Sequence, residues 1–233
     1  NVPSTVDAIY ALLLTGKDQL NQSEKITVEL GKQTLPVSTT ANPLGYLKYT
    51  YTASEIQPDM LNADITQTTD SPSWGGLYLQ YFEKFDQVQQ QKGILSVTKK
   101  LFIEKIGSDG KQELLPLGKE KLKTGDKVIT RLTLSLKQDM DFLYLKDFRA
   151  ACFEPIGQLS GNQWKFGTVY YEESKDAVTN FFFNSLAKGT YVLEYPVWVN
   201  QAGTYQDGIA TFQSMYAPEY TAYSEAGKIT VTK

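Results

Sequence analysis

Histidine is absent from the 233 residues of this chain, and cysteine occurs only once, as Cys152. Without histidine the chain cannot form a Ser-His-Asp triad, a Cys-His dyad or a histidine-liganded zinc site. A single cysteine also excludes an intrachain disulfide and a four-cysteine metal site. Any catalysis would have to depend on carboxylates, Lys or Tyr, so the composition argues against an enzyme and implies neither a metal nor a cofactor.

The chain also lacks a targeting segment and a strong charge. It begins at Asn1 with no initiator Met, no signal-like apolar run and no transmembrane stretch, so we expect a fragment of a longer protein whose targeting signal lies outside it. The formal net charge is only −3 and the basic residues are scattered, which argues against a nucleic-acid surface.

Residues 1–20 predict one helix. Ser4 and Asp7 form an N-cap arrangement, and Gly16 marks the expected end. The apolar residues recur at helical spacing, at Val6, Ile9, Tyr10 and Leu13. A single helix cannot bury this stripe alone, so it either packs on the following sheet or is the stump of a preceding helical domain.

From Ile26 onward the hydrophobic period changes to two, and the 15 Tyr and 11 Phe, with many Thr and Val, also favour strands. Residues 24–90 predict a small β-module that ends in a polar linker, QVQQQKG (87–93), and residues 94–233 predict an antiparallel β-sandwich. The expected strands of the module are 26–30, 35–37, 47–51 and 63–65, and those of the sandwich are 97–106, 113–117, 128–136, 140–148, 169–171, 180–183, 191–199, 208–215 and 229–231. An Asp109-Gly110 turn joins the first two strands of the sandwich. The predicted fold class is therefore mainly β, with a smaller β-module and a short helix ahead of the sandwich.

Two carboxylate pairs are candidates for acid–base chemistry, Asp139 with Asp141 and Glu172 with Glu173. A hydrolase needs two carboxylates that converge on one cleft, about 5–9.5 Å apart. Both pairs lie at predicted strand ends or turns, so we interpret them as solvated charges. The Gly- and Lys-rich stretches at 107–111 and 118–127 lack the spacing of a phosphate-binding loop and are interpreted as turns.

Aromatic side chains are the other candidates. Trp74, Trp164 and Trp198 are the three tryptophans; Trp164 is the best surface candidate, whereas Trp198 alternates with two valines and is expected to pack in the sandwich. In SMYAPEY (214–220), Pro218 cannot donate to a β-ladder, so the chain leaves the sheet there. Met215 and Tyr216 then either cap the core or are presented to another surface.

Three long stretches, together with their order, resemble the C-terminal domain of bacterial α2-macroglobulins, and most of all the large forms of Bacteroidetes-type bacteria. They are LYLKDFRAACFEPIGQLSG (143–161), YYEESKDAVTNFFFNSLAKGTYVLEYPVWV (170–199) and GIATFQSMYAPEYTAYSEAGKITV (208–231). Less distinctively, TVDAIYALLLTG (5–16) resembles the last helix of the family's helical, thioester-bearing domain. Residues 24–90, with SWGGLYLQYFE, resemble the β-region that links that domain to the last macroglobulin-like sandwich.

The resemblance implies a non-catalytic part of a broad-spectrum protease trap located in the periplasm or anchored by lipid to the outer membrane. In such proteins a protease cuts a bait segment, the molecule rearranges, and a thioester is released to couple to the attacker. The last sandwich packs against the thioester domain, and a Met-Tyr pair shields the thioester from water. By motif match, the shielding residues here are Met215 and Tyr216, in the loop that contains Pro218. The expected partners are the helical domain of the same parent protein and, indirectly, proteases.

Two observations limit this resemblance. The chain contains no C-x-E-Q, the thioester motif, and no bait segment, so it leaves open whether the parent has a thioester. Around Cys152 the sequence is C-x-E-P, and proline has no carboxamide from which a thioester can form. With no imidazole in the chain to lower the pKa of the thiol, we expect Cys152 to be a buried, slowly alkylated filler on a strand, with Ala150 on the same face and Ala151 opposite. The alternative function is that of an extracellular β-sandwich that binds glycans or adheres to surfaces, through Trp164 and exposed tyrosines. An exposed coplanar row of aromatic side chains in a groove would favour this alternative.

Overall fold

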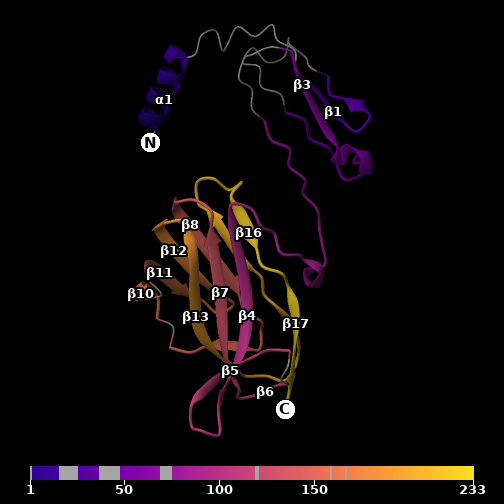
Figure 1. Cartoon of the computed structure of the whole chain (residues 1–233). Coiled ribbons are helices and arrows are strands. Elements are labelled where there is room, and N and C mark those ends of the chain that lie inside the picture. Colours follow the sequence, from indigo (N-terminus) through magenta and orange to yellow (C-terminus); the bar gives the residue numbers. More distant parts are fainter. Residues whose placement is uncertain are drawn as a thin grey trace. The chain divides into compact units, whose positions relative to one another are not determined.

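The computed structural model describes residues 2–15, 26–36, 48–68, 75–118, 121–157, 159–165 and 167–233 (Figure 1). The chain divides into two compact units, Asn1–Leu79 and Gln80–Lys233. No helix in the described ranges is long and apolar enough to cross a membrane.

The first unit contains the predicted helix, α1 (Val2–Thr15). The helix already includes Ser4, so the predicted N-cap is wrong; Pro3 is compatible with a first turn because the first N–H groups of a helix need no intrahelical acceptor. Gly16 lies outside the described residues. The side chains of Val6, Ile9 and Tyr10 are exposed, so this part of the apolar stripe remains uncovered in the described part of the unit; the side chain of Leu13 lies outside it.

A three-stranded sheet of order β2-β1-β3 forms the rest of the first unit. Its strands are β1 (Ile26–Leu30), β2 (Gln33–Thr34) and β3 (Ala63–Gln67). The short 3-10 helix η1 (Pro58–Leu61) comes just before β3 in the chain. The turn after β1 has Gly31 at φ 60°, a conformation that glycine adopts without strain.

Two strands predicted for this unit are wrong in the described residues. The strand expected at 35–37 is replaced by β2, because Pro36 has no N–H with which to extend the ladder after Leu35 donates to Val28 O at 2.8 Å. Residues 48–51 form no strand, although Tyr49 and Tyr51 alternate with polar residues. Both sides of β1 are already occupied by β2 and β3, and alternation alone does not supply a pairing partner. Val37 and Leu47 lie outside the described residues.

The second unit is a sandwich, and it confirms the predicted fold class. One sheet has the order β10-β11-β12-β8-β15-β16 and the other the order β5-β4-β7-β13-β9; a third sheet, β14-β17-β6, closes one side (Figure 1). The strands of the six-stranded sheet are β8 (Met140–Phe148), β10 (Gly161–Lys165), β11 (Thr168–Ser174), β12 (Val178–Leu186), β15 (Ala210–Ser214) and β16 (Thr221–Tyr223). Those of the five-stranded sheet are β4 (Leu95–Ile106), β5 (Gln112–Pro116), β7 (Lys127–Leu136), β9 (Phe153–Pro155) and β13 (Gly189–Val199). The third sheet consists of β6 (Leu122–Lys123), β14 (Gly203–Asp207) and β17 (Gly227–Thr232), in which β6 and β17 pair in parallel.

The core lies between the two larger sheets and follows from the period of two. In β7 the buried set includes Val128, Leu132, Leu134 and Leu136, the face predicted from the sequence. The predicted Asp109-Gly110 turn joins β4 and β5, with Gly110 at φ 77°. The short strands β6, β10, β14 and β16 were not predicted, because two to five residues give too little alternation to recognise.

The segment predicted as a linker belongs to this unit. It contains part of the 3-10 helix η2 (Phe85–Gln87), and Gln91 exchanges two backbone hydrogen bonds with Tyr223. The side chain of Gln90 donates to Val97 O at 2.7 Å. The polar residues of 87–93 therefore hold this stretch along the sandwich.

Candidate functional site

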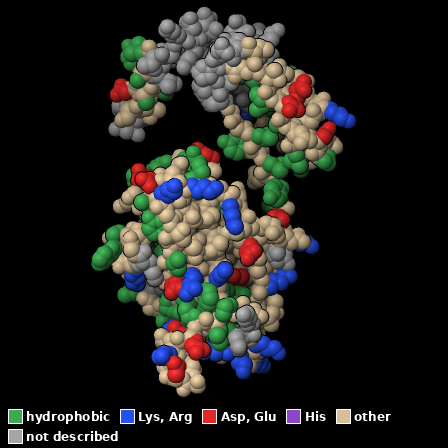
Figure 2. Space-filling view, viewed as in Figure 1, with side chains coloured by type: hydrophobic (Ala, Val, Ile, Leu, Met, Phe, Trp, Pro, Cys, Tyr) green, Lys and Arg blue, Asp and Glu red, His purple; other side chains and the backbone are tan. Residues whose placement is uncertain are grey.

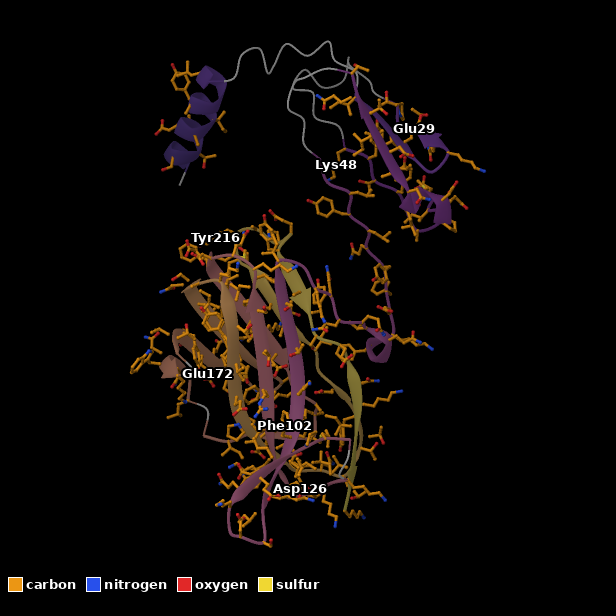
Figure 3. The ribbon with its side chains drawn as sticks, in the orientation of Figure 1. Glu29, Lys48, Phe102, Asp126, Glu172 and Tyr216 are labelled. Carbon is orange, nitrogen blue, oxygen red and sulfur yellow. The ribbon has the colours of Figure 1, made fainter. Side chains whose placement is uncertain are left out.

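The Met215–Tyr216 pair lies at one end of the sandwich, in the loop between β15 and β16. Figure 3 shows Tyr216 at this end. Met215 is 49% exposed and Tyr216 is 77% exposed, so the alternative that they cap the core does not hold. Large apolar side chains with this exposure on a soluble surface are candidates for an interaction with another surface.

The loop is fixed by its own hydrogen bonds. Ser214 N donates to Tyr220 O at 3.0 Å, and Tyr220 N donates to Ala217 O at 3.0 Å. Ala217 N donates to the hydroxyl of Ser214 at 3.3 Å, and Thr221 Oγ1 donates to Pro218 O at 2.6 Å. Pro218 therefore sits inside a closed turn, and its missing N–H leaves no donor unpaired.

A third apolar residue, which the sequence did not indicate, completes this surface. Phe142, near the start of β8, accepts a hydrogen bond from Met215 N at 2.8 Å, and its ring meets that of Tyr216 edge to face at 5.2 Å and 87°. Phe142 is itself 47% exposed. We call Phe142, Met215 and Tyr216 the apolar patch. Phe142 looks like any strand residue in the sequence, so only the three-dimensional pairing of β8 and β15 reveals it.

The carboxylate pairs do not converge on a cleft, and the prediction that Glu172 is solvated is wrong. Glu172 is not a solvated charge but is buried, because it follows Thr168 and Tyr170 on the inward face of β11. Burial raises the pKa of Glu172 above its ordinary value. Its neighbour Glu173 points outward, and hydrogen bonds from Asn180 and Lys175 lower the pKa of Glu173.

In the other pair, Asp139 connects two turns of the sandwich. Asp139 Oδ1 accepts a hydrogen bond from the backbone N of Lys188 at 2.7 Å, which joins the turn before β8 to the turn after β12. Asp141 is exposed, as predicted. In the described part of the chain, no three His, Cys, Asp or Glu side chains come close enough to hold a metal ion.

The tryptophans divide differently from the prediction. Trp164 is exposed on the edge strand β10, as expected, but Trp198 is 45% exposed and does not pack in the core. Because successive side chains of a strand point to opposite faces, burial of Val197 and Val199 places Trp198 on the outer face of β13. Trp74 lies outside the described residues.

An aromatic row does cross the outer face of the six-stranded sheet, and its geometry bears on glycan binding. Tyr171, Phe182 and Tyr144 are directly opposite one another on β11, β12 and β8. The rings of Tyr144 and Phe182 are stacked at 4.9 Å with an interplanar angle of 20°. Each ring thus covers a face of the other, so the pair does not offer the coplanar, outward-facing platform that sugar stacking requires.

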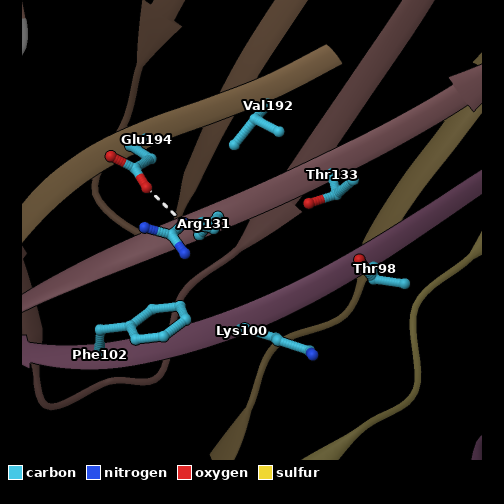
Figure 4. Close-up of a pocket in the computed structure, with 7 residues that line it drawn as sticks. All are labelled: Thr98, Lys100, Phe102, Arg131, Thr133, Val192 and Glu194. Atoms are coloured by element: carbon cyan, nitrogen blue, oxygen red, sulfur yellow. Dashed lines mark hydrogen bonds and ion pairs between the residues drawn. The ribbon is translucent and has the colours of Figure 1, made fainter. Parts of the chain in front are cut away.

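A shallow groove of about 630 Å³ lies on the outer face of the five-stranded sheet. Figure 4 shows Arg131 of β7 between Glu194 of β13 and Phe102 of β4. The guanidinium forms an ion pair with Glu194 and lies 4.4 Å from the centroid of the Phe102 ring. Its charge is therefore compensated within the sheet. Figure 2 agrees with this, since side chains of both signs are interspersed on this face.

The strongest electrostatic feature of the sandwich is a buried cluster around Lys99, which the sequence prediction missed. Lys99 Nζ lies 3.0 Å from Oδ1 of Asp147 and 3.0 Å from Oδ1 of Asp207, and it donates to Phe148 O at 2.6 Å and Gly208 O at 2.8 Å. The side chain of Lys99 is 3% exposed and that of Asp147 is fully buried. The Lys99 cluster thereby joins β4 of one sheet to β8 of the other and to the end of β14.

The protonation states in the Lys99 cluster are set by one ammonium group that faces two carboxylates. Burial alone would lower the pKa of Lys99, but Asp147 and Asp207 outweigh it and raise the pKa, so Lys99 stays charged. Burial raises the pKa of Asp207, because Lys99 does not fully compensate two buried negative charges. The hydroxyl of Tyr195 donates to Asp147 Oδ2, and burial raises the pKa of Tyr195 well above its usual range.

Cys152 is buried, as predicted, although in a turn before β9 and not on a strand. Ala150 is also buried and Ala151 exposed, and Phe153 N donates to Ala150 O at 2.9 Å to close the turn. Burial raises the pKa of the Cys152 thiol to about 11. The neighbouring Arg149 does not oppose this shift, because its guanidinium is directed to Thr179 Oγ1 and to the carbonyl oxygens of Lys175 and Asp176.

Comparison with known proteins gives one family and several weakly similar structures. No curated protein sequence matches the chain. Trypsin-activated α2-macroglobulin from Escherichia coli is 17% identical over 63% of this chain and 11% of its own length, with a TM-score of 0.48. Salmonella α2-macroglobulin reacted with methylamine is 16% identical over 90% of this chain and 13% of its own, also with a TM-score of 0.48. The chain thus spans only a small part of the proteins it matches.

The family comparison covers more than half of the chain. The sequence model of the bacterial α2-macroglobulin MG10 domain matches residues 95–219, which run from the first residue of β4 to the loop that holds the apolar patch. The chain therefore belongs to the bacterial α2-macroglobulin family, of which it carries the MG10 domain.

Proposed function

We propose that this chain is the non-catalytic C-terminal part of a broad-spectrum bacterial protease trap, and that its apolar patch packs against the helical, thioester-type domain of the same parent. In this proposal the Met215–Tyr216 loop excludes water from the thioester until a protease cuts the parent. The observation that carries the proposal is the exposure of Met215 and Tyr216 on a loop that hydrogen bonds hold in place.

The physical argument is that a thioester is hydrolysed in water and survives longer beneath an apolar lid. A thioether and an aromatic ring suit this task, because Met adapts to an irregular surface and the Tyr ring covers a large area with few rotatable bonds. A lid carried on a separate domain is removed when that domain moves, which couples cleavage to exposure of the reactive bond.

The rest of the chain has a place in the same proposal. Residues 1–20 would end the helical domain, residues 24–90 would form the linking β-module, whose last residues lie along the sandwich, and residues 94–233 would be the last macroglobulin-like sandwich. The exposed apolar stripe of α1 supports the first assignment, because a helix with an uncovered stripe needs further helices to bury it. The sequence resemblance supports a parent from a Bacteroidetes-type bacterium, in the periplasm or anchored by lipid to the outer membrane.

The experiment is to measure the lifetime of the thioester in the complete parent protein. We expect Tyr216→Ala to accelerate the loss of methylamine-reactive thioester, because water gains access to the bond. Trp164→Ala is the matched control, since Trp164 is also an exposed aromatic residue but lies on the edge strand β10. An unchanged lifetime in Tyr216→Ala, or a parent without a thioester, would refute the shielding role.

A further inference from the structure

Phe142 has an unusual backbone for a residue in a strand. Its φ is 52°, and among the described residues it is the only one other than glycine with a positive φ. A side chain with a Cβ crowds its own backbone in this left-handed region, and bulky residues are rarely found there. Strained positions of this kind persist where the surrounding structure requires them, often at functional sites.

The left-handed residue changes which side chains of β8 face the core. Leu143 and Leu145 are buried, so an undisturbed strand would direct Asp141 inward. Instead Asp141 is exposed and Met140 packs against the core. The backbone at Phe142 thus reverses the alternation and keeps a carboxylate out of the apolar interior.

The same conformation turns Phe142 toward the Met215–Tyr216 loop. On one side, the pairing with β12 passes from Leu143 to Asp141 without a partner for Phe142. On the other side, Met215 N donates to Phe142 O, one step beyond the Ser214–Leu143 pair of the β8–β15 ladder. The loop is therefore tied to Phe142 at the residue that precedes Tyr216.

The Phe142 ring supports the Tyr216 ring directly. The two rings meet edge to face at 5.2 Å, an arrangement that places the positive edge of one against the negative face of the other. Tyr216 remains 77% exposed despite this contact. The contact therefore leaves most of the Tyr216 ring free for another surface.

We propose that Phe142 is a positioning residue, which holds the Tyr216 ring in the orientation that its partner surface requires. Glycine would fit the backbone at this position better, so strain alone does not account for phenylalanine there. Among the described residues, the ring that phenylalanine supplies makes the one aromatic contact of Tyr216. This inference rests on the proposed shielding role of Tyr216, and it adds a second residue from a different strand to the same device.

Two substitutions at this position separate positioning from folding. Phe142→Gly removes the ring and suits the left-handed backbone, so we expect the thermal midpoint of the sandwich to stay the same or rise. Phe142→Tyr keeps an aromatic edge against Tyr216 and should behave like the unaltered protein. A lower midpoint for Phe142→Gly would overturn the proposal, because the phenylalanine would then serve the fold.

The positioning itself is measured in the 233-residue chain by NMR, without any requirement for a thioester. The ring protons of Tyr216 should shift on Phe142→Gly, the Met215 amide should exchange at least threefold faster, and both should return toward their original values in Phe142→Tyr. Unchanged Tyr216 resonances in Phe142→Gly would refute the proposal irrespective of what the parent does.

In the complete parent protein the readout is again the lifetime of the thioester. We expect Phe142→Gly to shorten it about threefold or more, by less than Tyr216→Ala, and Phe142→Tyr to leave it unchanged. If Tyr216→Ala shortens the lifetime and Phe142→Gly does not, the positioning role is wrong and the shielding role stands. If Tyr216→Ala has no effect, the shielding role is wrong, and the NMR result alone decides whether Phe142 orients the ring.

Discussion

Replacing Lys99 by Met should be one of the most destabilising single substitutions in the sandwich. Lys99 Nζ lies within 3.0 Å of two carboxylates and two backbone carbonyl oxygens, and its side chain is almost entirely buried. Methionine has a similar length and fills the space, so the packing loss is small. What remains is the burial of Asp147 and Asp207 without a counterion.

The magnitude follows from this arrangement. Removing one partner of a buried ion pair typically costs about 3–5 kcal/mol, because the other charge is left uncompensated. Since both carboxylates depend on Lys99, we expect a loss of about 4 kcal/mol. For a domain with a total stability of about 5–15 kcal/mol, this is a large fraction. With a urea m-value of about 2 kcal/mol/M, the midpoint of unfolding should fall by about 2 M.

The assay is urea denaturation followed by far-UV circular dichroism and by tryptophan fluorescence. Lys100→Met is the control at the adjacent position, where the side chain is exposed, and it should change stability by less than about 0.5 kcal/mol. Adding Asp207→Asn to Lys99→Met should recover part of the loss, because it removes one of the two unpaired negative charges. A midpoint for Lys99→Met within 0.5 M of the unaltered chain, or no recovery in the double variant, would refute the account of the Lys99 cluster.

Three further predictions concern single residues of the sandwich. Cys152 should react with DTNB in the folded chain at least tenfold more slowly than in urea, because burial raises its pKa to about 11; rapid labelling of the folded chain would contradict this. Glu172→Gln should stabilise the sandwich at pH 7 but not at pH 3. Burial raises the pKa of Glu172 in the folded state, so the neutral carboxyl is present below the unfolded value of about 4.5 and is lost as the pH rises through the folded pKa, whereas Gln stays neutral throughout. An equal effect on stability at both pH values would count against the burial of Glu172. Gly208→Ala should destabilise the sandwich by about 3 kcal/mol, because a Cβ at position 208 would lie 2.1 Å from Phe148 O. Gly227→Ala is the control and should be nearly neutral, because a Cβ at position 227 would meet nothing within 4 Å. Equal urea midpoints for the two variants would contradict the close approach of Gly208 to Phe148.

The sequence predicted the sandwich well, because alternation is long and regular in its main strands. The strand predicted at 140–148 has the observed bounds of β8, and β7 begins one residue before its predicted start. The small β-module was predicted less well. Tyr49 and Tyr51 have the pattern of a strand, but residues 48–51 pair with none of the strands in the described residues, and pairing depends on residues far away in the sequence.

The Lys99 cluster could have been predicted from the same alternation. Leu95, Val97, Leu101 and Ile103 point inward, so Lys99 must share their face. Asp147 follows Leu143 and Leu145 in the same way. A charged residue on each of two inward faces is a signal for a buried pair, which an interpretation of charged residues as solvated overlooks.

The candidate site was only half predictable. Met215 and Tyr216 came from the resemblance to a known family, and the proline after them indicated a loop. Phe142 could not be predicted, because neither its left-handed backbone nor its pairing with Met215 leaves a local signal. For Trp198 the prediction is wrong in the opposite sense: its two valine neighbours are buried, and alternation therefore places Trp198 on the other face of the strand.

The central claim is that Tyr216 faces the helical, thioester-type domain of the parent, and site-specific photocrosslinking tests it most directly. A benzophenone amino acid placed at position 216 of the complete parent should, on irradiation, form a covalent link to the helical domain near its thioester. When a protease has cut the parent before irradiation, this link should no longer form, because the lid has then moved away. A link to any other domain, or one that forms equally well when irradiation follows cleavage, would contradict the account.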